Sequence, residues 1–386
     1  MGGRRWLAPL AGMSVLRCTA AAALDLPLQL YLNSLGATPI VIGLASTLTW
    51  LGMLIGGPVW GSLGDRFSKK LLLWIILPAS SATFALLAVL LPPAGTVAIR
   101  FVRAAVIAGF APVTMALMSG ASTSQQRGTN LSYVSSARAL GWVLGGAMSG
   151  FVLEALGFRG TFAALACLPL LCIGFLVLLP SSPQRGSVKW SFPLRYLTDR
   201  WLGALYSGVV LRQLGIAGSF SLIFIYMARS GILISAMGLV SALPSLAQVL
   251  GLIAFGRLSD RVGRRRIFLL GFGLSALPAL FFAFSPELWG MSVGHLLVGI
   301  AFSALYIGST SHIGDVIPSE RHGVMLGLFD SARAAGGVLG PLIAGAVIPF
   351  IDYDGMFVLM SGISFLGFIL VLVGTRRPSE LTRSAS

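Results

Sequence analysis

A ten-residue segment occurs twice in this chain. It reads Gly-Ser-Leu-Gly-Asp-Arg-Phe-Ser-Lys-Lys at positions 61–70 and Gly-Arg-Leu-Ser-Asp-Arg-Val-Gly-Arg-Arg at positions 256–265, 195 residues later. Each copy lies between two long apolar runs, so a carboxylate and several cations are concentrated in a short connection. A single basic connection is explained if it does no more than orient the chain in a membrane. A second copy at a fixed spacing indicates an internal repeat.

The same spacing relates other parts of the chain. The segment Ser136–Gly141 recurs as Ser331–Gly336, and Arg17, Tyr31 and Gly36 each recur as the same residue type 195 positions on. A period of this length is too long for a solenoid repeat, but it fits six membrane spans with their connections. We therefore predict two copies of one six-span unit.

The composition places this repeat in a membrane. Hydrophobic residues make up 56% of the 386 residues and charged residues only 10%, whereas soluble domains carry about 25% charged residues. A membrane-spanning helix needs about 20 mainly apolar residues. The sequence predicts an all-α integral membrane protein with twelve transmembrane helices, near 9–33, 39–60, 71–91, 96–118, 130–153, 160–180, 204–227, 232–255, 267–284, 290–311, 323–349 and 355–375. The predicted domains are a six-helix bundle at 1–180, a cytoplasmic linker at 181–203 and a second bundle at 204–386.

The net charge is +15, and the positions of the basic residues along the chain agree with the predicted topology. Most Lys and Arg fall in the termini and in the connections on one side, and only Arg159 and Arg229 fall in connections on the other. Basic connections stay in the cytoplasm, so both termini and the repeated segment are expected there. This distribution excludes nucleic acid as the partner of the basic residues. We expect a monomeric multi-pass protein of the inner (plasma) membrane, with the lipid bilayer as its surroundings.

The repeated segment resembles the signature of the major facilitator superfamily of secondary transporters. The resemblance implies two six-helix bundles around a central cavity, alternating access, and docking of Asp65 and Arg66 on the eleventh span in one conformation. The first copy departs from the signature at Ser68, where glycine is usual. The residues of this expected conformational-switch motif are Gly61, Asp65, Arg66, Lys70, Gly256, Asp260, Arg261 and Arg265.

Arg100 and Pro112 resemble the superfamily's motif in the fourth helix, although Ala104 replaces its usual glycine. The repeat of Arg100 is His295. The resemblance implies that Arg100 either holds helix packing or assists proton coupling.

Two stripes of small residues resemble a motif associated with antiporters and exporters. Small residues at every fourth position let two helices approach closely. In the first stripe Gly146 replaces the proline of the motif, so the second stripe matches better. The predicted helix-packing residues are Gly141, Gly145, Gly150, Gly336, Gly340 and Pro341.

Asp25 is an acidic residue inside the first predicted span, two positions before Pro27. A carboxylate in a span is costly unless it faces a cavity or a partner. Asp25 is therefore the candidate for proton coupling, and Pro27 predicts a break in the helix nearby.

Arginines occupy equivalent positions in the two halves, Arg17 with Arg212 and Arg138 with Arg333. The resemblance places their spans around the cavity, where guanidinium groups can bind a carboxylate or phosphate. These four residues are the substrate-binding candidates. The alternatives are that they extend toward the cytoplasmic surface, or, for Arg333, that it pairs with Asp330 three residues before it.

Two transport hypotheses follow. The first is proton-coupled export of a small organic compound, favoured by Asp25 and the second glycine stripe. The alternative is an organic anion or organophosphate transporter or exchanger, favoured by the paired arginines. No residue pattern indicates an enzyme, a metal site or a cofactor, and the sequence has no phosphate-binding loop for ATP.

Overall fold

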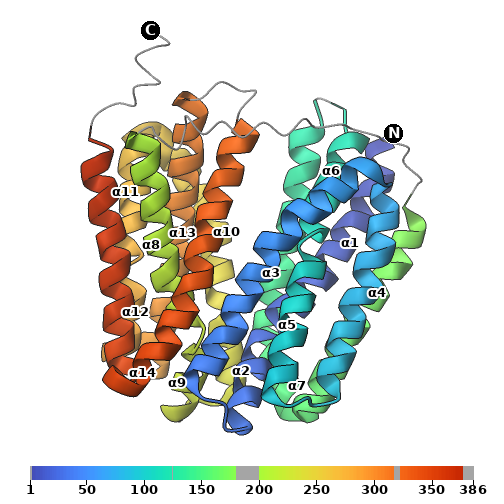
Figure 1. Cartoon of the computed structure of the whole chain (residues 1–386). Helices are drawn as coiled ribbons and strands as arrows, with labels where there is room; N and C mark the ends of the chain where they lie inside the picture. The colour runs from blue at the N-terminus through green and yellow to red at the C-terminus, as the bar shows by residue number, and fades with distance from the viewer. Residues whose placement is uncertain (1, 124, 180–199, 317–321, 377–386) are drawn as a thin grey trace. The chain divides into compact units, whose positions relative to one another are not determined.

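The computed structural model describes residues 2–123, 125–179, 200–316 and 322–376, and this part of the chain is almost entirely helical (Figure 1). The helices of the first half are α1 Gly2–Ala22, α2 Asp25–Ser34, α3 Pro39–Arg66, α4 Lys69–Ala88, α5 Pro93–Ile107, α6 Phe110–Ala121 and α7 Arg127–Leu178. Those of the second half are α8 Arg200–Phe220, α9 Ile223–Arg229, α10 Ile234–Val262, α11 Arg264–Leu274, α12 Leu277–Phe284, α13 Leu288–Val316 and α14 His322–Gly374.

Ten of the described helical stretches are long and apolar enough to cross a membrane. Two of them, in α7 and α14, are 52 and 50 residues long, about twice what one crossing needs. Each is interrupted by a residue with positive φ, Gly157 at 61° and Asp352 at 56°. Counting the two limbs of each as separate spans would give the twelve that the sequence predicts.

Prolines explain three further breaks. A proline lacks an N–H, and its ring collides with the carbonyl four residues earlier. Pro27 thereby separates α1 from α2, Pro112 separates α5 from α6, and Pro278 separates α11 from α12. The break between α8 and α9 has no proline, and there the Ser219 and Ser221 hydroxyls bond to carbonyls of α8.

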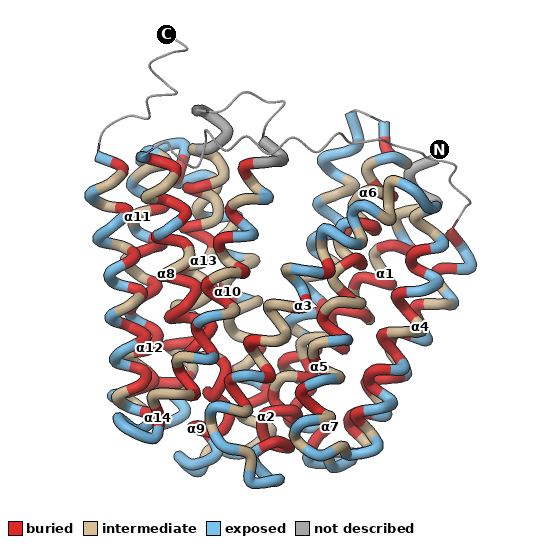
Figure 2. Tube along the Cα trace, in the orientation of Figure 1, coloured by how far each residue is buried: buried red, intermediate tan, exposed pale blue. Residues whose placement is uncertain are grey.

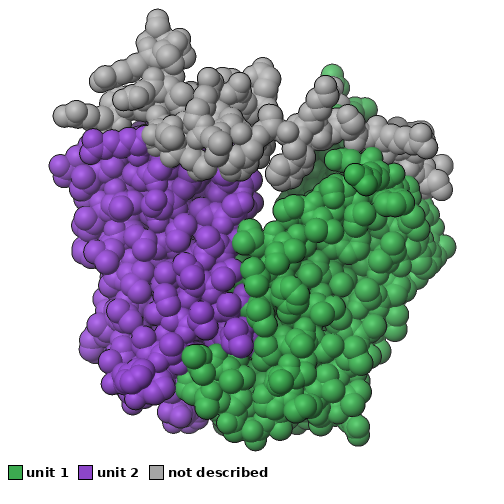
Figure 3. All heavy atoms as spheres, viewed as in Figure 1, with its two compact units in different colours: residues 1–41, 48–189, 233–242 green, residues 42–47, 190–232, 243–386 purple. Residues whose placement is uncertain are grey.

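The chain divides into two compact units (Figure 3). Unit 1 comprises residues 1–41, 48–189 and 233–242, and unit 2 comprises 42–47, 190–232 and 243–386. The units follow the two halves of the repeat except for two short helical segments. Residues 181–199 of the predicted linker lie outside the described residues, and α8 begins at Arg200. The last residues of that linker, 200–203, are therefore helical.

The glycine stripes bring α7 onto α1 and α14 onto α8 in the same way. A Cβ on Gly141 would lie 2.4 Å from the Val15 carbonyl oxygen, and one on Gly336 would lie 2.3 Å from that of Val210. Gly145 and Gly340, one turn further on, approach α1 and α8 just as closely. A side chain at these four positions would push the helices apart, so the repeat preserves the contact in both halves.

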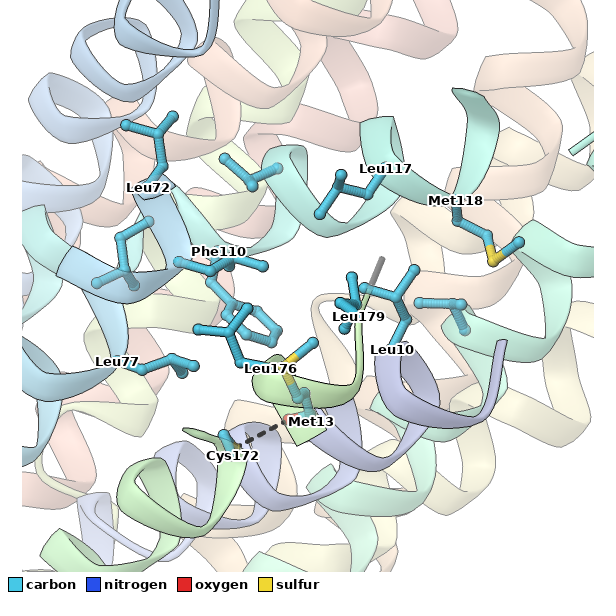
Figure 4. Packing of buried hydrophobic residues seen from close by; sticks show 14 of the residues in the cluster. Leu10, Met13, Leu72, Leu77, Phe110, Leu117, Met118, Cys172, Leu176 and Leu179 are labelled. Carbon is cyan, nitrogen blue, oxygen red and sulfur yellow. Dashed lines mark hydrogen bonds between the residues drawn. The ribbon is translucent and has the colours of Figure 1, made fainter. Parts of the chain in front are cut away.

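Each unit has an apolar core at equivalent positions. In unit 1 it includes Leu10, Leu73, Leu77 and Phe110 from α1, α4 and α6 (Figure 4). In unit 2 the equivalents of Leu73 and Leu77 are Phe268 and Phe272, while that of Phe110 is Leu305. The aromatic volume has thus moved from one helix to another while the core stays filled. These residues lie in the buried stretches drawn red in Figure 2.

Candidate substrate and proton-coupling sites

Asp25 and Arg100 form an ion pair in unit 1. Asp25 is the first residue of α2, directly after the break caused by Pro27, and Arg100 lies on α5. The Arg100 Nη2 donates to Asp25 Oδ1 at 2.6 Å, and its Nε donates to Thr49 Oγ1, also at 2.6 Å. The Arg100 side chain is 6% exposed and that of Asp25 is 47% exposed. A buried guanidinium therefore holds a carboxylate that remains open on one side.

The sequence indicated both residues but did not join them. Arg17 lies on the same predicted span as Asp25, but the partner of Asp25 is Arg100, 75 residues away. The repeat carries a signal that could have found the pair. The equivalents of Asp25 and Arg100 are Phe220 and His295, so the acid and the arginine are both replaced in the second half.

Arg103 lies one turn beyond Arg100 and is also buried. Its guanidinium carbon is 4.5 Å from the centroid of the Phe84 ring, within the range of a cation–π interaction. Its Nε has no hydrogen-bond partner in the described part of the chain. Two buried arginines thus lie one turn apart on α5, and of these Arg100 has a carboxylate within 4 Å among the described residues.

Arg17 is 9% exposed and does not reach the surface as an extended arginine would. Its guanidinium carbon lies 5.5 Å from the Phe110 centroid, and its Nη1 is 3.8 Å from Cys18 Sγ. Arg138, on α7, is half-buried. No hydrogen bond or ring contact to the Arg138 side chain occurs among the described residues. The two candidates of unit 1 are therefore not held in the same way.

Arg212 and Arg333 meet at one aromatic ring in unit 2. Their guanidinium carbons lie 5.8 and 4.9 Å from the centroid of Phe302. Arg212 on α8 is 2% exposed, and it donates from Nε to Ser275 Oγ at 2.9 Å and from Nη1 to Gln213 Oε1 at 3.0 Å. The charge of Arg333 acts on Arg212. Two of the four arginine candidates therefore share a site.

Arg333 also pairs with Asp330, as its three-residue spacing indicated. The Nη1–Oδ1 distance is 3.2 Å, and the side chains are 25% and 69% exposed. An exposed pair at this distance contributes little to stability. The Arg333 Nε remains buried and has no partner among the described residues.

His295, the equivalent of Arg100, is fully buried in an aromatic environment. Its ring centroid lies 5.0 Å from that of Phe220 and 5.2 Å from that of Phe282. Its Nδ1 contacts the Met291 carbonyl at 2.8 Å, and its Nε2 has no partner in the described chain. The position of the ion pair in unit 1 is thus aromatic in unit 2.

The repeated segment is more helical than a connecting loop. The helix α3 continues through Asp65 to Arg66, and α10 continues through Asp260 to Val262. Gly61 and Gly256 have open space where a Cβ would lie, so packing among the described residues does not require glycine at either position.

The two copies of the repeated segment have different backbone conformations at the position where one has Ser68 and the other Gly263. Ser68 begins α4 with φ −66°, and its hydroxyl accepts a hydrogen bond from the Leu71 N–H at 3.3 Å. Gly263 precedes α11 with φ +98° and has no side chain to form such a cap. The serine that departs from the superfamily pattern therefore caps a helix.

The last cation of each copy binds the end of the last helix of its own half. Lys70 donates to the carbonyl of Leu179, directly after α7. Arg265 donates to the carbonyls of Leu372 and Thr375 at the end of α14, at 3.2 and 3.0 Å. Cations stabilise helix C-termini because the final carbonyls lack partners. No sequence pattern indicated these partners.

A surface hollow of about 700 Å³ lies beside the second copy. It is lined by Ser259, Asp260, Val262, Gly263, Arg264, Arg265, Arg266 and His312. The hollow does not include the arginines that lie inside the spans.

Comparison with known proteins decides the family. The model of the Major Facilitator Superfamily matches residues 10–233 and again residues 205–386. The chain belongs to this superfamily. It is thus a multi-pass membrane transporter for a small molecule and not an enzyme.

Two relatives in this superfamily match nearly the whole length of this chain in sequence. Multidrug resistance protein MdtG of Citrobacter koseri is 25% identical over 382 residues, which cover 94% of this chain and 93% of that protein. The MdtG of Proteus mirabilis is 23% identical over 373 residues, with 92% and 91% covered.

Solved structures confirm the predicted fold. The nucleoside transporter NupG superposes with a TM-score of 0.80 at 14% identity, covering 97% of this chain and 100% of NupG. A bacterial homologue of the human lysosomal transporter Spinster superposes with a TM-score of 0.76 at 15% identity, covering 97% and 95%. At this identity the likeness concerns the fold alone.

Proposed function

We propose that this transporter exports small organic compounds across the inner membrane in exchange for protons, with Asp25 as the coupling acid and both termini in the cytoplasm. The relatives named as multidrug resistance proteins support export. The one observation that carries the coupling role is the Asp25–Arg100 pair. The basic termini and connections support the orientation.

The pair has the properties that coupling requires. A proton on Asp25 removes the charge that Arg100 binds, and this weakens the 2.6 Å contact. Arg100 keeps its bond to Thr49, so the helix α5 stays anchored to α3 while α2 is released. Asp25 is half-exposed, so it can exchange protons with a cavity. Protonation thereby changes a contact between α2 and α5.

The experiment is transport in vesicles with an imposed pH gradient. We expect Asp25→Asn to abolish gradient-driven transport while substrate exchange continues, because the amide cannot ionise. Glu154→Gln is the control, since Glu154 is an acid of the same unit that lies outside both candidate sites and accepts a hydrogen bond from the Ser235 N–H. Gradient-driven transport at the wild-type rate in Asp25→Asn would exclude Asp25 as the coupling acid.

Transport of an organic anion or organophosphate is the second candidate. It is favoured by three arginines that each have one buried guanidinium nitrogen without an acceptor among the described residues, Arg17, Arg212 and Arg333. An anionic substrate would supply those acceptors. Exchange of one anion for another without a pH gradient, unaffected by Asp25→Asn, would favour this candidate over proton coupling.

The repeated segment is proposed to control the change of conformation. Asp65, at the end of α3, would dock on α14 in one state, and Arg66 would assist it. We expect Asp65→Ala to shift the population toward states open to the cytoplasm, with little loss of folded protein. Labelling of single cysteines on the two membrane faces measures this shift. Unchanged labelling together with lost expression would mean that Asp65 serves folding only.

A further inference from the structure

The ring of Phe302 in unit 2 brings together two positive charges. It lies on α13 and is approached by Arg212 from α8 and by Arg333 from α14, with both guanidinium carbons within 6 Å of its centroid. Cations of like charge repel each other, and more strongly away from water. The arrangement therefore calls for an anion.

The charge of this cluster is not balanced within the described part of the chain. Asp330 is the one carboxylate found within 4 Å of either arginine there, and its side chain is 69% exposed. One positive charge remains. Two guanidinium nitrogens, Arg212 Nη2 and Arg333 Nε, are buried and have no hydrogen-bond acceptor among the described residues. A buried donor without an acceptor is costly.

Access to the cluster is through Arg333 and the ring itself. The Arg333 side chain is 25% exposed, and Phe302 is partly exposed. Tyr306, one turn further along α13, is partly exposed and stacks on Phe302 with ring centroids 5.6 Å apart. An aromatic surface therefore lies next to the two cations.

We propose that Arg212, Arg333 and the aromatic pair Phe302–Tyr306 form a binding site for an organic anion with an apolar or aromatic body. The acidic group binds the two guanidinium groups, and the body lies on the aromatic surface. This rests on the proposed transport function and names its substrate class. At this site Arg212 is joined by Arg333, and not by its repeat equivalent Arg17.

Unit 2 itself provides a control. The Arg229 guanidinium carbon lies 4.6 Å from the centroid of the Tyr353 ring, so this arginine also contacts an aromatic ring, but it lies on α9 and outside the proposed site. Arg229→Gln therefore removes an arginine–aromatic contact without changing the proposed site.

The test measures ligand stabilisation of the full-length protein in phosphatidylcholine nanodiscs. Benzoate and phenyl phosphate are titrated while the melting temperature is recorded, with neutral benzamide for comparison, because a ligand that binds only the folded state raises this temperature. We expect the anions, but not benzamide, to stabilise the wild type and Arg229→Gln. In Arg333→Gln the apparent affinity should fall at least about 10-fold.

Arg333→Lys separates charge from geometry. Lysine keeps the positive charge but loses the planar fork, so its affinity should lie between wild type and Arg333→Gln. Equal anion affinity in Arg333→Gln and wild type, equal stabilisation by benzamide, or no response to either anion would each overturn the proposal.

Two further measurements identify the source of the anion and separate anion binding from proton coupling. Phosphatidylglycerol added to the nanodiscs should leave benzoate binding unchanged; suppression through Arg333 would assign the site to a lipid headgroup instead. Asp25→Asn should keep the benzoate response, because binding needs no proton gradient. Failure of proton coupling and failure of this site are therefore observed separately.

Discussion

The two halves of this transporter share a backbone but differ in chemistry at equivalent positions. In unit 1, Asp25 and Arg100 form a 2.6 Å ion pair. In unit 2, the same two positions hold Phe220 and His295, whose rings lie 5.0 Å apart. The contact between the helices survives in both halves, while only one half keeps groups that can exchange charge. The difference assigns the proposed proton coupling to unit 1.

The reverse difference appears on the same helices, two turns further along α5 and α13. Unit 2 has Phe302 beside Arg212 and Arg333, whereas unit 1 has Ile107 at the equivalent position. Arg138 consequently lacks the ring that Arg333 contacts. One unit thus has a charged pair where the other has an aromatic contact, and the other has an aromatic arginine site that the first lacks. In the mechanism proposed above, coupling and cargo recognition are carried by different halves.

The largest effect is expected from giving unit 2 the chemistry of unit 1. His295→Arg places a charge among Phe220 and Phe282 without a partner, and a buried unpaired charge costs about 3–5 kcal/mol. We expect a strong fall in the yield of folded protein and in its melting temperature. Adding Phe220→Asp should restore part of both, because it supplies the carboxylate that unit 1 has at Asp25.

Fluorescence-detected size-exclusion chromatography measures both variants. The matched control is Phe220→Asp alone, which should be as poorly folded as His295→Arg. If the double variant gives no more folded protein than either single variant, the two sites are equivalent in backbone position but not in side-chain chemistry.

The repeat explains why much of the fold could be predicted from the sequence. The offset of 195 residues, the apolar runs and the glycine stripes fix which helices exist and which of them pack closely. Gly36 and Gly231 have φ of 72° and 76°, so even a turn is preserved. The long helices α7 and α14 differ from the predicted separate spans because their turns keep helical hydrogen bonding up to Gly157 and Asp352.

The partners of the charged residues could not be predicted in the same way. Asp25 and Arg100 are 75 residues apart, and Lys70 binds a carbonyl 109 residues away. Sequence spacing gives the face of a helix but not the neighbour that the face meets. Only the local pair, Arg333 with Asp330, followed from spacing alone.

The next effect concerns the cations that hold the last helix of each half. Arg265→Ala removes two bonds to the end of α14, and Lys70→Ala removes one bond to the end of α7. Hydrogen bonds to charged groups contribute about 1.5–3 kcal/mol when buried and less when exposed. We expect Arg265→Ala to lower the melting temperature more than Lys70→Ala. The exposed neighbour Arg266 is the control, and an equal fall in Arg266→Ala would show that net charge, not the contact, is responsible.

A smaller effect distinguishes the two turns of the repeated segment. Gly263 has φ +98°, where a side chain is strained by about 1–3 kcal/mol. Gly263→Ala should therefore destabilise the protein. Ser68→Ala should cost about 1 kcal/mol through loss of the helix cap, and Ser68→Gly only a few tenths. Thermal melting of the three variants gives the order. A Gly263→Ala variant as stable as wild type would mean that the turn relaxes to the conformation seen at Ser68.

The smallest effect is expected at Asp352, whose backbone has a conformation that is usually found only in glycine. Asp352 has φ 56° and ψ −176°, and its equivalent Gly157 has φ 61° and ψ −176°. This region is occupied almost only by glycine, at a cost of about 1–3 kcal/mol for other residues. The Asp352 Oδ1 accepts a 2.8 Å hydrogen bond from the Tyr353 N–H, which offsets part of that strain.

Replacing Asp352 separates these two contributions. Asp352→Gly removes the strain and the hydrogen bond together, so a net stabilisation of about 1 kcal/mol or less is expected. Asp352→Ala keeps the strain and loses the bond, so it should destabilise by about 1 kcal/mol. Gly157→Ala has room for its Cβ and should lose stability through strain alone. If melting shows Asp352→Gly to be no more stable than Asp352→Ala, the positive φ costs nothing at this turn, and the two halves are related here in shape but not in energetics.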